Sequence, residues 1–186
     1  MKKSRPAPFL GLKPYGAIDP DLVEGLVGPL RLIFPLPAEI LPAAVVPPDA
    51  FKPNRGQYLS TDLLVDLVDH APPGCARILG MTDVDLFIPI LTYVYGEAML
   101  PGRAAVVSSC RLAQDPLAGN VDYRVLRDRV LKEAAHELGH TFGLTHCDDK
   151  RCAMSFSHSL EQLDQKQASF CRYCAVLLTD GLRMPF

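Results

Sequence analysis

Three histidines and one glutamate within eleven residues constrain this chain most, because they predict a metal site whose ligands the fold must bring together. His136 and His140 are four residues apart, so on a helix their side chains leave one face a turn apart and can chelate one zinc ion. Glu137 follows the first histidine, where a carboxylate can accept a proton from zinc-activated water. Gly143 can end the helix at positive φ, which lets the chain turn and deliver His146 as a third ligand.

The ligand count favours a catalytic site over a structural one. Three protein ligands leave the fourth position of a tetrahedral zinc ion open for water. The alternative is two surface histidines beside an ordinary charged residue, since H-E-x-x-H also occurs in helices that bind nothing. The added glycine and third histidine argue against that alternative. We therefore predict a catalytic zinc on His136, His140 and His146, with Glu137 as a solvent-facing general base.

Four cysteines predict a second metal site next to the first. Cys147 and Cys152 form one close pair, and Cys171 and Cys174 form another after eighteen intervening residues. Two such pairs are typical of a structural zinc held by four thiolates. The alternatives are reduced core cysteines, or a redox C-x-x-C, whose strand-to-helix context is not evident here. Because His146 and Cys147 are adjacent, we expect two separate mononuclear sites, the second fixing the loop that holds His146.

Other candidate ligands are assigned simpler roles. Cys75 and Cys110 lie outside the cysteine pattern and are expected to be small buried hydrophobic residues. His70 ends a predicted helix, where complementing the helix dipole or facing solvent is favoured over ligation. His158 is expected at the surface, with substrate contact as the less favoured alternative.

Composition indicates an ordinary globular domain. The 186 residues suit one domain with a real core, and 48% hydrophobic and 22% charged residues are globular values. A net charge of −2 gives no indication of a nucleic-acid or anionic-membrane partner, and no apolar stretch predicts a transmembrane helix. We expect a monomer.

The basic N-terminus resembles the start of a signal peptide, but Pro6, Pro8 and Gly11 interrupt any apolar core of one. Residues 1–16 are interpreted as an extended tail or a first edge segment. We therefore expect a cytoplasmic protein, in which six cysteines are better explained by metal than by disulfides.

Helical and strand patterns alternate along the chain. Helices are predicted from Asp19 to a stop at Gly28-Pro29, over 63–70, over 122–142 and after a cap at Ser159, and strands over 30–35, 76–81, 91–98 and 104–109. This alternation predicts an α/β (α+β) fold with a mixed, mostly parallel sheet. The aromatic, alternating run over 91–98 suits an antiparallel edge strand.

Together these motifs resemble the archaemetzincins, a family of zinc metallopeptidases in the metzincin clan. The resemblance rests on H-E-x-x-H-x-x-G-x-x-H-C, which is the extended metzincin pattern, and on Cys152, Met154 and the Cys171/Cys174 pair. The run from Tyr93 through Leu112 matches less specifically. The similar part covers about half of the chain.

The resemblance implies a compact metzincin-like catalytic domain over residues 1–186, with an active-site helix and a C-terminal helix. An N-terminal subdomain would span 17–143, and a C-terminal subdomain would span 144–186. Met154 would form a Met turn, a hydrophobic floor under the zinc histidines, although a methionine alone is more often ordinary core. The implied cofactors are two zinc ions per chain, one catalytic and one structural.

The expected function is a zinc-dependent metallopeptidase acting on peptide or protein substrates. The strand near residues 91–95 would hold an extended peptide by strand addition. An alternative is a zinc-stabilised peptide-binding module with little or no peptidase activity, against which the intact Glu137 argues. A weaker alternative is a hydrolase of non-peptide amides. The family resemblance does not supply a natural substrate.

Overall fold

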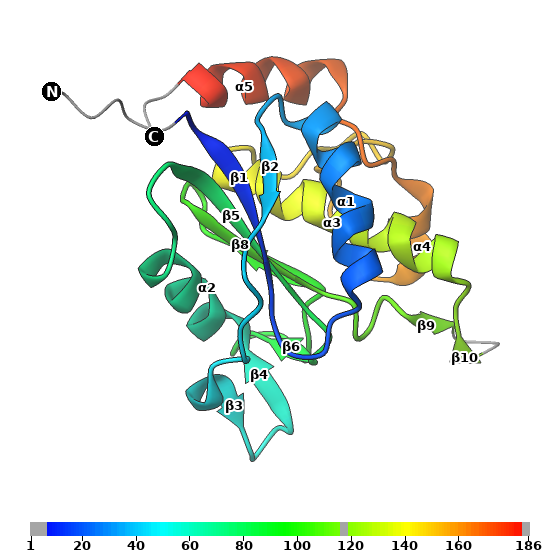
Figure 1. Cartoon of the computed structure of the whole chain (residues 1–186). Coiled ribbons are helices and arrows are strands. Elements are labelled where there is room, and N and C mark those ends of the chain that lie inside the picture. The colour runs from blue at the N-terminus through cyan, green and yellow to red at the C-terminus, as the bar shows by residue number, and fades with distance from the viewer. Residues whose placement is uncertain (1–6, 116–118, 184–186) are drawn as a thin grey trace, which may run out of the picture.

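A five-stranded mixed sheet forms the centre of the computed structural model, which describes residues 7–115 and 119–183 (Figure 1). Its strand order is β2-β1-β5-β8-β7. The strands are β1 (Phe9–Pro14), β2 (Ala38–Ile40), β5 (Cys75–Thr82), β7 (Gly96–Ala98) and β8 (Ala104–Ser108). The first four in the order are parallel, and β7 pairs antiparallel with β8 at the edge. The predicted mostly parallel sheet with an antiparallel edge strand is confirmed.

Helices cover both faces of this sheet. The helices α1 (Pro20–Ile33) and α3 (Tyr123–Thr141) lie on one face, and α2 (Ser60–Asp69) lies on the other. Alternate side chains of β5 show the two faces, since Leu79 and Met81 join the core under α1 and α3, whereas Ile78 joins the core under α2. A parallel sheet buried in this way requires strands that are apolar on both sides.

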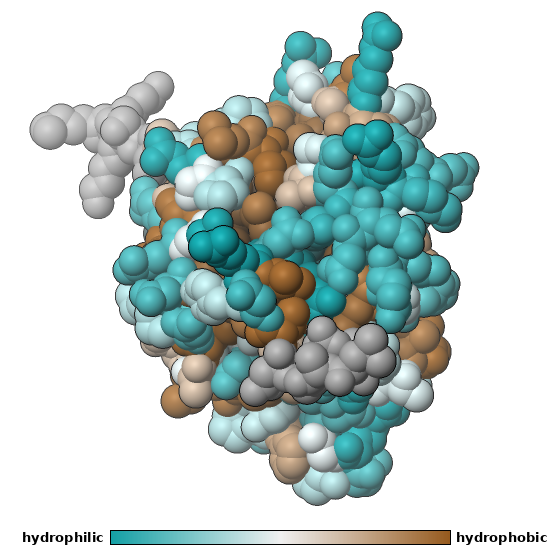
Figure 2. All heavy atoms as spheres, turned by 90° about the vertical axis from the view of Figure 1, so that its right-hand side faces the viewer, coloured by the Kyte–Doolittle hydropathy of each residue, from teal (hydrophilic) through white to brown (hydrophobic). Residues whose placement is uncertain are grey.

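Shorter elements surround the sheet. They are a 3-10 helix η1 (Pro48–Ala50), the strands β3 (Phe51–Lys52), β4 (Gln57–Leu59) and β6 (Leu86–Phe87), the hairpin strands β9 (Gln114–Asp115) and β10 (Gly119–Asn120), and the helices α4 (Leu160–Gln165) and α5 (Arg172–Arg183). On the face of the molecule that carries α4 and the hairpin, hydrophobic residues lie in separate groups among hydrophilic ones (Figure 2). Within the described ranges, no helix has both the length and the apolar character needed to cross a bilayer.

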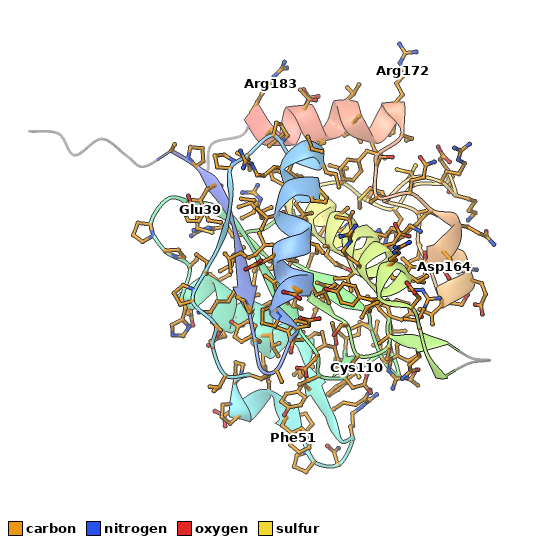
Figure 3. All side chains as sticks on the ribbon, turned by 45° about the vertical axis from the view of Figure 1, so that its right-hand side comes forward. Glu39, Phe51, Cys110, Asp164, Arg172 and Arg183 are labelled. Carbon is orange, nitrogen blue, oxygen red and sulfur yellow. The ribbon has the colours of Figure 1, made fainter. Side chains whose placement is uncertain are left out.

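Helix α5 packs against the C-terminal end of α3 (Figure 1). A Cβ at Gly181 would lie 2.5 Å from the Phe142 carbonyl oxygen, so the two helices approach as closely as a glycine allows. Phe142 also stacks on Phe34, with ring centroids 5.5 Å apart, and Phe34 meets the edge of Phe170. Arg172 and Arg183, at the two ends of α5, point away from this contact (Figure 3).

Two predictions near the N-terminus are wrong. The strand expected over 30–35 is the last turn of α1, which continues through Pro29. Leu22, Leu26 and Leu30 share the buried face of that helix, and their burial outweighs the hydrogen bond that proline cannot make. Residues 9–14 are neither a tail nor an edge, since β1 lies between β2 and β5. Residues 1–6 lie outside the described part.

Two further predictions hold only in part. Of the strand expected over 91–98, only Gly96–Ala98 is regular, and Val94 makes an isolated bridge to Leu86. The single helix expected after Ser159 is divided into α4 and α5. Ser159 caps α4 as predicted, by accepting a hydrogen bond from the backbone N–H of Gln162.

Candidate functional site

The third histidine reaches the first two through a turn at the end of α3. The helix begins at the capping residue Asp122, whose side chain accepts a hydrogen bond from the Arg124 N–H. Gly143 has a φ of 89°, and the N–H of Leu144 returns to the Gly139 carbonyl. The turn predicted from Gly143 is therefore present.

His136, His140 and His146 lie together, with one ring nitrogen from each within 4.8 Å of the others. The Nδ1 of His136 is 2.8 Å from the Ala153 carbonyl oxygen, and the Nδ1 of His140 is 2.7 Å from that of Leu144. A carbonyl can only accept, so each Nδ1 carries the proton and each Nε2 presents a lone pair. These histidines are thus held in the tautomer that a metal needs.

The spacing of the two helical histidines fits zinc. Their Nε2 atoms are 3.1 Å apart. Zn–N bonds of about 2.0–2.1 Å at tetrahedral angles would separate two ligands by about 3.3 Å. Burial is the main cause that lowers the pKa of His136, His140 and His146, and the Lys166 ammonium adds to it. Neutral imidazole, the ligating form, is therefore favoured at all three positions.

Glu137 is buried rather than solvent-facing, with 6% of its surface exposed. A Cβ at Gly96 would lie 2.7 Å from its Cγ and 2.6 Å from the Val106 carbonyl oxygen, so the glycine lets β7 lie directly on Glu137. Burial raises the pKa of Glu137 well above its ordinary value, the neighbouring Glu133 adds to that, and Lys166 opposes it. The expectation of a solvent-facing base is corrected because β7 closes over α3 at this point.

A cavity of about 330 Å³ opens onto Glu137 and the three histidines. Its walls come from the segment before β7, from α3 and from the segment after Met154. The lining residues are Leu91, Thr92, Tyr93, Val94, Tyr95, Glu133, His136, Glu137, His140, His146, Phe156, Ser157, His158 and Lys166. His158 is exposed as predicted, and it also lines this cavity, where its ring meets Phe156 edge-on at 4.3 Å.

Met154 packs against α3 beside the helical histidines. It is fully buried, and its sulfur is in contact range of Gly139, which lies on α3 directly before His140. Its carbonyl accepts a hydrogen bond from the backbone N–H of Cys147 at 3.0 Å. Met154 therefore packs against α3 and also holds the backbone of Cys147, the first residue of the cysteine cluster.

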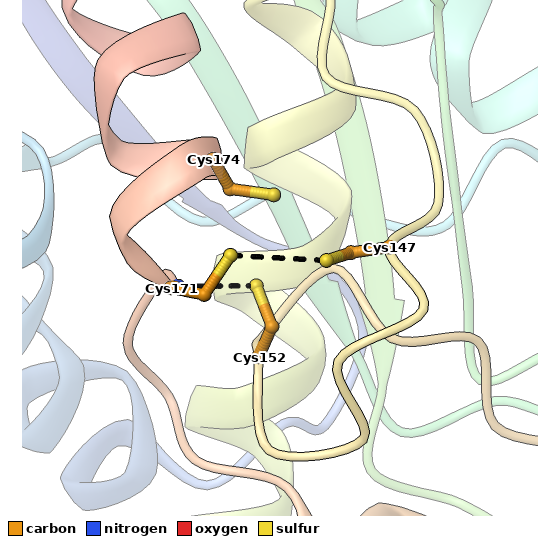
Figure 4. Close-up of side chains that lie close together, drawn as sticks. All are labelled: Cys147, Cys152, Cys171 and Cys174. Carbon is orange, nitrogen blue, oxygen red and sulfur yellow. Dashed lines mark hydrogen bonds between the residues drawn. The ribbon is translucent and has the colours of Figure 1, made fainter.

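Cys147, Cys152, Cys171 and Cys174 form the second cluster, with all four Sγ atoms within 4.8 Å of one another (Figure 4). The first two come from the loop after α3, and the last two from the start of α5. The Sγ atoms of Cys147 and Cys171 are 3.8 Å apart, about the separation that Zn–S bonds of about 2.3 Å give in a tetrahedron. All four are free thiols, so the donor set fits zinc.

The remaining candidates lie away from both clusters. Cys75 is buried on β5, as predicted, whereas Cys110 is only half-buried after β8 (Figure 3). His70 is exposed at the end of α2 and bonds the Asp66 carbonyl.

Two charged residues in the cavity were not predicted. Glu133 precedes Glu137 by one helical turn, so its spacing already indicated the same helix face. Lys166 gave no comparable signal, because its position depends on how α4 packs on α3.

Comparison with known proteins gives a consistent result. The sequence profile of peptidase family M54 matches residues 36–180. The archaemetzincin of Methanopyrus kandleri is 47% identical over 140 residues, which are 75% of this chain and 76% of the relative. That of Methanocaldococcus jannaschii is 37% identical over 169 residues, 91% of this chain and 92% of the relative.

Solved structures agree over nearly the whole chain. The crystal structure of the Methanopyrus kandleri archaemetzincin superposes with a TM-score of 0.84 at 37% identity, covering 99% of this chain and 100% of that one. The zinc-dependent peptidase of Methanocorpusculum labreanum gives a TM-score of 0.80 at 28% identity, covering 91% and 99%.

Proposed function

Since the chain belongs to peptidase family M54, the archaemetzincins, and is a zinc metallopeptidase, we propose that Glu137 is its general base and that three histidines bind its catalytic zinc. The ligands are His136, His140 and His146. The observation that carries the proposal is geometric: three imidazole nitrogens converge beside a buried carboxylate in one cavity. Two of the imidazoles are oriented by backbone carbonyls, so little rearrangement is needed on binding.

The chemistry divides between the metal and the chain. Bound zinc supplies a Lewis acid that lowers the pKa of a water molecule and polarises the scissile carbonyl. Glu137 accepts the proton of the attacking water on a carboxylate oxygen and delivers it to the leaving amine nitrogen. Glu137 has little exposed surface, so its carboxylate is largely shielded from bulk water and meets water through the cavity.

The substrate is proposed to be an extended peptide beside β7. One edge of β7 pairs with β8, and within the described residues no strand pairs with its other edge. A peptide adding to that edge would run towards the cavity wall formed by residues 91–95.

The four cysteines are proposed to bind a second, structural zinc, which gives two zinc ions per chain. Four thiolates complete a tetrahedron and leave no open position for substrate. The cluster ties α5 to the loop that carries His146, and all four cysteines lie within the proposed C-terminal subdomain, residues 144–186. Thiols grouped for a metal rather than for disulfides also support a reducing compartment such as the cytoplasm.

The test is digestion of an unbiased peptide library by zinc-loaded protein, with and without chelator. Cleavage that chelator abolishes and zinc restores is the expected result. A binding module would instead retain peptides without cleaving them while holding its full zinc content. Cleavage of small amides but of no peptide would favour the third alternative.

A further inference from the structure

Glu133 contacts the proposed base from the preceding turn of α3. Both glutamates are 6% exposed, and one of the two carboxyl groups donates a hydrogen bond to the other, so the pair holds one proton. Because they share the buried side of the helix, Glu133 lies behind Glu137 at the cavity wall rather than at the surface. The orientation of the Glu137 carboxyl group is thus coupled to that of Glu133.

Lys166 completes the group from a different element. Its side chain is 1% exposed, and its Nζ lies 3.8 Å from Glu133 Oε2. The same Nζ donates a hydrogen bond to the Ser155 carbonyl at 3.2 Å. Ser155 follows Met154, so the ammonium is anchored to the segment that begins at Met154. Three parts of the chain therefore meet at the two carboxyl groups: α3, the end of α4 and the segment after Met154.

Attachment of α4 to α3 does not explain this buried charge. Arg129 on α3 already makes a two-point contact with Asp164 on α4, at 2.8 and 2.7 Å. Lys132 adds a hydrogen bond to the Asp164 carbonyl. Burying an ammonium and a carboxylate carries a large desolvation penalty, and apolar residues of similar size pack as well or better. A pair retained under these conditions beside the reactive carboxylate indicates a role in the site.

We propose that Glu133 is a positioning residue, which holds the Glu137 carboxylate towards the cavity by a hydrogen bond and is itself held by Lys166. The proposal rests on the proposed role of Glu137 as base. Without Glu133, the Glu137 carboxyl group loses this hydrogen bond, and the acceptor oxygen is no longer fixed relative to the attacking water. Lys166 acts indirectly, by fixing Glu133 and offsetting the negative charge of the hydrogen-bonded carboxyl pair.

The experiment compares zinc-loaded, full-length protein with three variants: Glu133→Gln, Glu133→Met and the double variant Glu133→Met/Lys166→Met. Glutamine keeps a hydrogen bond to Glu137, whereas methionine keeps only the volume. The double variant removes Lys166 together with Glu133, so it leaves no buried ammonium without a carboxyl partner, and it is expected to fold. We expect both methionine variants to lower kcat by roughly 10- to 100-fold, the scale of a misplaced catalytic group, with unchanged KM and zinc content. Glu133→Gln should recover most of the loss.

The second readout is structural and independent of turnover. In a crystal structure of zinc-loaded Glu133→Gln, the Glu137 carboxylate should lie as it does in the parent. In a crystal structure of the zinc-loaded double variant, the same carboxylate should be displaced. An unmoved carboxylate, or parental kcat in both methionine variants, would overturn the proposal. Asp164→Asn is the control for a merely structural role, because it weakens the α3–α4 contact without touching Glu133, and its kcat should remain parental.

If Glu137 is not the general base, the variants give a different set of activities. If Glu137→Ala cleaves peptides as well as the parent, the base assignment is wrong whatever the Glu133 variants do. If Glu137→Ala is inactive while the double variant is fully active, only the positioning role is wrong. Should the parent cleave no peptide, the crystal structures still decide whether Glu133 positions Glu137.

Discussion

The Nε2 atoms of His136 and His140 lie 3.1 Å apart, one turn from each other on α3. Each ring is fixed from behind by a carbonyl oxygen, one on Ala153 and the other on Leu144. Both carbonyls belong to the chain that follows the helix, so the two nitrogens are held at ligand spacing by segments that come later in the sequence. Three histidines leave one position of a bound zinc ion open, whereas four cysteines fill all four positions. We therefore expect the two sites to release zinc at different chelator concentrations.

Freshly purified, zinc-replete protein is expected to hold two zinc ions per chain, a count that the two donor sets imply. The zinc on the histidines should leave first under mild chelation, because its site is open to solvent through the cavity, whereas four thiolates enclose the other. Elemental analysis during a chelator titration would measure both steps. One zinc at most, with all four clustered cysteines open to alkylation, would remove the second site.

Replacing Glu137 with alanine is expected to keep the zinc and the fold but to lower kcat by about 10²–10⁴-fold, the usual contribution of a positioned acid–base group. Substrate affinity should change little, since the carboxylate acts on the water rather than on the peptide. Peptide hydrolysis and zinc content would be measured together. The matched control is His140→Ala, which should lose zinc and activity at once. Equal cleavage by the parent and Glu137→Ala contradicts the assignment.

Cys171→Ser is expected to lower the melting temperature by roughly 10 °C, since a domain of this size shifts by about 2–4 °C per kcal/mol and a closed zinc site contributes several kcal/mol to folding. Cys110→Ser serves as the control, because that half-buried thiol lies outside the cluster and should leave the melting temperature nearly unchanged. Calorimetry of the three proteins in excess zinc would measure the difference. Indistinguishable curves for Cys171→Ser and the parent would argue against a structural metal.

Gly96→Ala is expected to disturb stability and activity together. The added methyl group would lie 2.6 Å from the Val106 carbonyl oxygen and 2.7 Å from Glu137 Cγ, so β7 or Glu137 must move. Overpacking of this kind destabilises by about 1–3 kcal/mol, and displacement of the base should lower kcat. Denaturant unfolding and peptide hydrolysis would measure both effects.

Gly28→Ala is the matched control for that substitution. It lies inside α1, and apart from its chain neighbours and its own helix backbone nothing is within 4 Å of the new methyl group. It should change the free energy of unfolding by less than about 1 kcal/mol, because the gain in helix propensity is offset by the contact of a Cβ with the Pro29 ring that follows. Parental stability and kcat in Gly96→Ala would show that the close contact does not constrain Glu137.

Local spacing made most of the site predictable from sequence. His136, Glu137 and His140 are related by one helical turn, and Gly143 needs only its own positive φ to redirect the chain. Lys166 could not be foreseen, because its partners are set by the packing of α4 on α3. The mixed sheet followed from alternating patterns, but the interior place of β1 did not, because strand order depends on contacts distant in sequence.

The order of the ligands along the chain has a consequence for biosynthesis. A protein leaves the ribosome N-terminus first, so all three histidines and Glu137 emerge before Cys171 and Cys174. Until those last thiols arrive, the loop carrying His146 lacks the anchor that the cysteine cluster provides (Figure 4). We therefore expect the loop that carries His146 to reach its final position only after Cys171 and Cys174 have been synthesised.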